Sequence, residues 1–226
     1  MSALALVAAG LAAGSVHVVS GPDHLAAVLP LAVADRERAA RVGFRWGLGH
    51  GAGVVALGAL GQLLAGSVPI EAVSAVSERL VGVLLVLLGV WAIRRSRLIT
   101  VHAHGHAHPD TDHVHAHVHV ADGTVEEPQH AASGQHATHR HSAFGFGLVH
   151  GAAGAGHLFG VLPSLVLSPS HAAIYLAAYV GSAVVSMTVF AAAAAALVRG
   201  PGRVPAVLGA SGALSVVVGL GWLVVV

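Results

Sequence analysis

Long apolar blocks alternate along the chain with short connections that hold arginine, glycine or proline. Six such blocks occur, at about residues 3–33, 42–66, 77–93, 143–168, 171–198 and 204–226. Each is close to the roughly 20 residues that a helix needs to cross the hydrocarbon of a bilayer. The blocks are continuously apolar, whereas the strands of membrane barrels alternate between apolar and polar residues. The pattern therefore predicts an all-α membrane protein with about six transmembrane helices.

Composition and charge agree with this prediction and suggest an orientation. The chain is 55% hydrophobic and 9% charged, whereas soluble domains carry about 25% charged residues. Arginines concentrate in the first, third and fifth connections: Arg36, Arg38, Arg41 and Arg45, then Arg94, Arg95, Arg97 and Arg140, then Arg199 and Arg203. Because cytoplasmic loops are enriched in Lys and Arg, we expect a multi-pass protein of the cell's inner (plasma) membrane with these connections inside. The lipid bilayer is then a partner, and a net charge of +1 gives no indication of a nucleic-acid partner.

A histidine-rich segment separates two halves of the chain. Residues 98–142 hold twelve of the 18 histidines, many of them alternating with small residues. The segment lacks the apolar residues of a packed core, which predicts a disordered cytoplasmic loop between membrane halves at 1–97 and 143–226. Clustered imidazoles suit capture, buffering or sensing of divalent ions, although a merely hydrophilic linker is the simpler alternative.

An internal repeat relates the two halves. Residues 17–30 read HVVSGPDHLAAVLP and residues 150–163 read HGAAGAGHLFGVLP, with seven of fourteen positions identical. Each copy opens a unit of three apolar blocks, so the two units would enter the membrane from opposite sides. The sequence thus predicts two inverted three-helix repeats whose first helices are broken, one at Gly21-Pro22 and one at 151–156. In transporters with inverted repeats, binding sites lie near such breaks.

The polar residues at these breaks are candidate metal ligands. Histidine and aspartate are costly inside a membrane and usually functional, and imidazole with a carboxylate suits Ni, Co, Zn or Cu. The candidates are His17, Asp23 and His24 at the first break, His50 between glycines in the second block, and His150 and His157 as the counterparts of His17 and His24. The alternative is a structural polar network that braces the breaks.

Four further residues are predicted to be structural. His171 lies at the outer end of the fifth block, and the tryptophans Trp46, Trp91 and Trp222 are expected to be anchors at the membrane interface.

The motifs resemble a known family. His17 with Asp23-His24, Leu48-Gly49-His50 and Leu148-Val149-His150-Gly151 look like the nickel/cobalt transporter superfamily, which includes nickel/cobalt permeases, efflux proteins with a His-rich loop, and hydrogenase/urease accessory permeases. The resemblance implies a metal site at His17, Asp23, His24 and His50, with nickel-enzyme maturation proteins as possible partners.

Together these observations predict a transporter and not an enzyme. The function expected is membrane transport of a divalent transition-metal ion, nickel or cobalt by preference, through the His/Asp site, with the ion as cargo and no resident cofactor. Three alternatives stay open: an exporter that uses the loop as a metal collector, an intramembrane metalloenzyme or haem protein, and an accessory protein that delivers nickel without transporting it.

Overall fold

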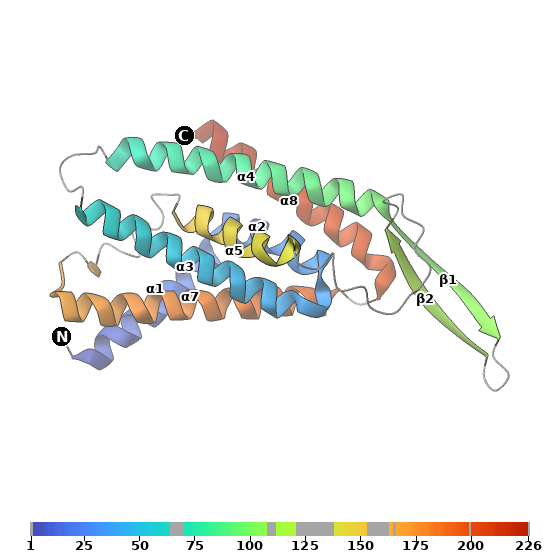
Figure 1. Ribbon diagram of the computed structural model, residues 1–226, viewed down its shortest axis with the longest axis horizontal. Coiled ribbons are helices and arrows are strands. Elements are labelled where there is room, and N and C mark those ends of the chain that lie inside the picture. The colour runs from blue at the N-terminus through green and yellow to red at the C-terminus, as the bar shows by residue number, and fades with distance from the viewer. Residues whose placement is uncertain are drawn as a thin grey trace.

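The computed structural model describes residues 2–63, 70–107, 112–120, 138–152, 163–164, 166–198 and 200–225. Over these residues a bundle of α-helices carries a two-stranded hairpin that projects from one end (Figure 1). The α-helices are α1 Ala3–Ser20, α2 Pro22–Ala34, α3 Ala39–Leu63, α4 Ile70–Leu98, α5 Thr138–Gly151, α7 Pro169–Leu197 and α8 Val204–Val225. Short 3-10 turns, η1 Arg36–Arg38 and η2 Pro201–Arg203, precede α3 and α8, and the strands are β1 Ile99–Ala107 and β2 Asp112–Val120.

The surface of the bundle is apolar in the way that a membrane location requires. Within the described residues, Ala3–Ser20, Pro169–Leu197 and Val204–Val224 are long and apolar enough to cross a membrane, and Pro22–Ala34 is a shorter apolar helix. Large apolar side chains point outward from these helices, with Leu197 76% exposed and Val217 66% exposed. The prediction of a helical bundle is confirmed for the described residues, and the length and apolar composition of three helices support a membrane location.

The first predicted break is present. Helix α1 ends at Ser20, Gly21 is extended with φ −84° and ψ 103°, and Pro22 is the first residue of α2. Proline is favoured at the first position of a helix because an N–H there would have no acceptor within the helix, and because the φ of proline already suits a helix. Of the second break, at 151–156, the structure describes the beginning: α5 ends at Gly151, while 153–162 lie outside the described residues.

Glycines let the helices around the centre approach closely. A Cβ on Gly14 of α1 would collide with the backbone carbonyl of Tyr179 on α7, and a Cβ on Gly147 of α5 would collide with the carbonyl of Trp46 on α3. Such contacts between small residues and a facing backbone are typical of membrane helix pairs. They draw α1 onto α7 and α5 onto α3, which encloses the polar residues carried by α1, α3 and α5.

The first, third and fifth connections meet at one end of the bundle. The buried residues Val33, Ala92, Val198 and Leu208, from the ends of α2, α4, α7 and α8, form one apolar cluster. Across it, Arg36 of η1 donates from Nε to the carbonyl of Ala195 at 3.4 Å and from Nη2 to the carbonyl of Val198. The arginine-rich connections therefore share one end, as the orientation argument requires.

The histidine-rich segment contains two strands in the part that the structure describes. Strands β1 and β2 pair antiparallel, from Ile99 opposite Val120 to Ala107 opposite Asp112, and α5 already begins at Thr138. The alternation of histidine with Val, Ala or Gly repeats every two residues, which is the period of a strand. Residues 108–111 and 121–137 lie outside the described residues.

Candidate metal centre

Four helices each bring imidazole or carboxylate groups to one buried point. His17 lies in the last turn of α1, and Asp23 and His24 lie in the first turn of α2, directly after the break. His50 is in the middle of α3, and His150 lies in the last turn of α5. His24, His50 and His150 are at most 2% exposed. The structure thus brings together five of the six predicted site residues, and the sixth, His157, lies outside the described residues.

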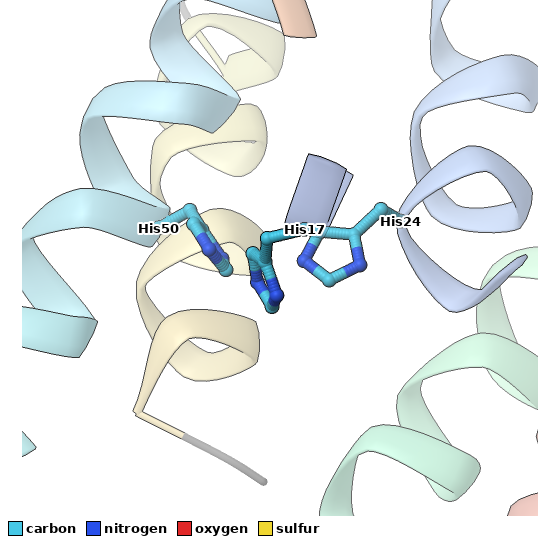
Figure 2. A group of neighbouring side chains, drawn as sticks. All are labelled: His17, His24 and His50. Carbon is cyan, nitrogen blue, oxygen red and sulfur yellow. The ribbon is translucent and has the colours of Figure 1, made fainter. Parts of the chain in front are cut away.

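Three of the imidazoles face one another. The ring centroids are 4.6 Å apart for His17 and His24, 5.0 Å for His24 and His50, and 5.6 Å for His17 and His50. Figure 2 shows the three rings gathered around a common point. One nitrogen from each of the three rings lies within 4.8 Å of the others. Three nitrogens at this spacing could bind one metal ion after small side-chain adjustments, since Zn–N bonds are about 2.0–2.1 Å.

Asp23 connects the fourth histidine to this group. Its Oδ1 lies 3.1 Å from Nδ1 of His24, and its Oδ2 lies 3.1 Å from Nε2 of His150. Asp23, His24 and His150 form a second group whose potential ligand atoms lie within 4.8 Å of one another. His24 therefore belongs to both groups, and the carboxylate holds two imidazoles at once.

The Asp23 contact determines which nitrogen of His24 is available to an ion. An ionised carboxylate only accepts hydrogen bonds, so Nδ1–H of His24 is the donor to Oδ1. In the neutral form of the ring the lone pair is then on Nε2, which is the nitrogen that an ion could bind. Metal-binding histidines commonly use a carboxylate in this way to fix the tautomer and the orientation of the ring.

Two aromatic residues that the sequence analysis did not assign to the site border it. The ring centroid of Tyr179 is 5.8 Å from that of His17, and the ring centroid of Trp46 is 5.7 Å from that of His150. Both are completely buried, so the prediction of Trp46 as an interfacial anchor is wrong. Spacing offered a signal, because Trp46 and His50 are four residues apart and share one face of α3. His171 lies outside the cluster, with its Nδ1 3.0 Å from Oγ of Ser168.

The charge of the site favours a bound cation. The five residues supply one carboxylate and four imidazoles in a low-dielectric interior, where an ionised carboxylate without compensation is costly. A divalent ion would offset that charge and accept lone pairs from the ring nitrogens.

Comparison with known proteins gives a partial match. No family model matches the chain, and no solved structure matches it. The chain is similar to the "Chloroplast protein FOR GROWTH AND FERTILITY 1" of Arabidopsis thaliana, with 42% identity over 88 residues, and to the "Chloroplast protein FOR GROWTH AND FERTILITY 2" of the same plant, with 41% identity over 88 residues. Each match covers 38% of this chain and 24% of the plant protein. The chain thus matches about a quarter of the length of these curated relatives.

These relatives overturn the family and the function inferred from the motifs. Their names refer to the chloroplast and to growth and fertility, and nickel and cobalt transport do not appear in them. The resemblance to the nickel/cobalt transporter superfamily is therefore wrong, and so is the prediction of nickel or cobalt transport; the alternatives are not favoured either. The physical reason is that a His and Asp motif indicates that a cation can bind, but it does not identify the ion or show that the ion is transported, because imidazole binds several first-row metals. The apolar helices support a membrane location, but the plasma membrane is not supported.

Proposed function

We propose that the helical bundle binds one divalent transition-metal ion of the zinc type between His17, His24 and His50. The single observation that carries this proposal is the convergence of three buried imidazoles, from α1, α2 and α3, with one nitrogen each within 4.8 Å of the others. Zn²⁺ takes such nitrogen ligands in tetrahedral geometry, with a fourth ligand from the protein or water. The ion would link both sides of the helix break to α3.

In this proposal Asp23 supports the ligands and does not bind the ion itself. Both of its oxygens are already 3.1 Å from ring nitrogens, one of His24 and one of His150. It would fix the tautomer of His24, supply negative charge close to the ion and anchor His150 of α5. The alternative position, between Asp23, His24 and His150, would require these contacts to break, which is why the three-histidine position is preferred.

We also infer that the two halves form an inverted repeat around this centre. His17 and His150 are aligned in the repeat, and each packs beside a buried aromatic ring, Tyr179 for His17 and Trp46 for His150. Three residues before each histidine, Gly14 and Gly147 meet the carbonyls of the same two aromatic residues. The pairs α1/α7 and α5/α3 are thus equivalent in both the aligned residues and their contacts, which supports the repeat.

The test is a zinc-binding measurement on the full chain in detergent. Metal-free wild type, His17→Ala and His50→Ala would be loaded with zinc, dialysed against a weak chelator and analysed for bound metal. Because each variant lacks one ligand, it should hold about one equivalent less than the wild type. His171→Ala is the matched control, since His171 lies outside the cluster, and it should retain the full content. Equal zinc in wild type and both cluster variants would refute the proposal.

A further inference from the structure

The hairpin arranges its histidines in register. In the pairing of β1 with β2, His102 is opposite His117, His104 is opposite His115, and His106 is opposite His113. Because alternate residues of a strand share a face, these three pairs occupy consecutive positions on the same face of the ladder. The other face holds pairs of small or apolar residues, such as Val101 opposite Val118 and Ala103 opposite Ala116.

The spacing of such pairs suits metal ions. Directly opposed residues in an antiparallel ladder have Cβ atoms about 4.5–5.5 Å apart, and successive pairs on one face follow at about 6.8 Å along the strands. Two opposed histidines can therefore bind one ion, and two neighbouring pairs can supply the four nitrogens of a tetrahedral site. The aligned register distinguishes this arrangement from a random histidine tract, in which the order of the residues has no importance.

We propose that the β1–β2 hairpin is a second metal-binding site, in which zinc-type ions bind between cross-strand histidine pairs and stabilise the pairing of the strands. This site is independent of the ion proposed for the bundle. A two-stranded hairpin is marginally stable in water on its own. An ion that binds only the paired state raises the ratio of paired to unpaired hairpin by a factor of 1 + [L]/Kd, which is about tenfold at a free zinc concentration ten times Kd.

The chain contains no cysteine, so the pairing can be measured with two introduced labels. In the full chain, Val101→Cys with Val118→Cys places two pyrene-labelled cysteines at opposed positions on the face without histidines. Zinc should raise the ratio of excimer to monomer fluorescence. In the control, Val101→Cys with Val114→Cys, the second label is moved four positions along β2, and the zinc response should be several-fold smaller.

Removing histidines separates this site from the bundle site. In the labelled chain, His104→Ala with His115→Ala should reduce the zinc response several-fold, and so should His102→Ala with His117→Ala. His17→Ala, in the bundle, should leave it unchanged. No rise in excimer with zinc, an equal rise in the control pair, or a full response without the histidine pairs would overturn the proposal. Loss of the response in His17→Ala would also overturn it, because the signal would then come from the bundle.

Discussion

Replacement of Asp23 by asparagine tests the supporting role of the carboxylate. The side chains have nearly the same shape, so Asp23→Asn removes the charge and converts one acceptor into a donor. The wild-type carboxylate lies 3.1 Å from Nδ1 of His24 and 3.1 Å from Nε2 of His150. Asparagine can accept from one of these rings, but its NH₂ group faces the other. One imidazole must then change its tautomer or lose its contact.

The size of the effect follows from these two contacts. Loss of a carboxylate that orients a metal-binding histidine lowers metal affinity about 10–100-fold, which corresponds to about 1.4–2.7 kcal/mol of binding free energy. The number of ions bound should stay the same, because His17, His24 and His50 remain. His17→Ala removes a ligand and should instead abolish binding of the one zinc equivalent in the bundle.

Competition between the protein and a chromophoric chelator for zinc, in detergent, measures both quantities. Asp35→Asn is the matched control, since Asp35 follows the other end of α2, and its affinity should equal that of the wild type. An affinity within about threefold of wild type in Asp23→Asn would refute the supporting role. Loss of the whole zinc equivalent in Asp23→Asn would show that Asp23 binds the ion directly.

Four further outcomes are expected. Gly147→Ala should lower the unfolding free energy by about 1–3 kcal/mol, because its new Cβ meets the carbonyl of Trp46. Gly145→Ala should cost nothing in the same thermal unfolding assay, because its new Cβ has no atom of the other described elements within 4 Å. Ser215→Ala should cost about 0.6–1.7 kcal/mol, since its Oγ donates to a carbonyl of α2 at 2.6 Å; an unchanged melting temperature would contradict this. Tyr179→Phe should leave the stability of the metal-free protein unchanged or raise it by about 1 kcal/mol, because within the described residues the buried hydroxyl has no hydrogen-bond partner, and a clear loss in thermal unfolding would show that it has one. The zinc equivalent that His17→Ala loses should be bound more weakly as the pH falls, because protons compete with the ion for the ring nitrogens. Zinc titration at several acid pH values checks this, and an affinity that stays constant over the whole acid range in which the protein remains folded would contradict histidine ligation.

Local chemistry made part of this structure predictable. The break at Gly21-Pro22 follows from the backbone preferences of two residues, and it brings His24 back toward His17. The candidate histidines could be recognised because polar groups are scarce in apolar blocks. Their convergence on one point depended on contacts between segments far apart in the chain, such as Gly147 against Trp46, which no local pattern reports.

Other features could not be decided from the sequence in the same way. Tryptophan has an apolar ring and a polar N–H, so it suits both a membrane interface and an interior, and Trp46 occupies the interior. The histidine-rich segment carries two competing signals, since its low content of large apolar residues is typical of disorder, whereas the alternation of histidine with Val, Ala or Gly has the period of a strand. The metal carried no signature at all, since the same imidazoles bind several ions.

The hairpin follows the helical bundle without an intervening residue. Strand β1 begins at Ile99, the residue after the end of α4 at Leu98, and Ile99 packs against the cluster of Val33, Ala92, Val198 and Leu208. A joint with no intervening residue has few backbone angles that can absorb a rotation. We therefore expect a rotation of the hairpin to displace the ends of α2, α4, α7 and α8, which form this cluster.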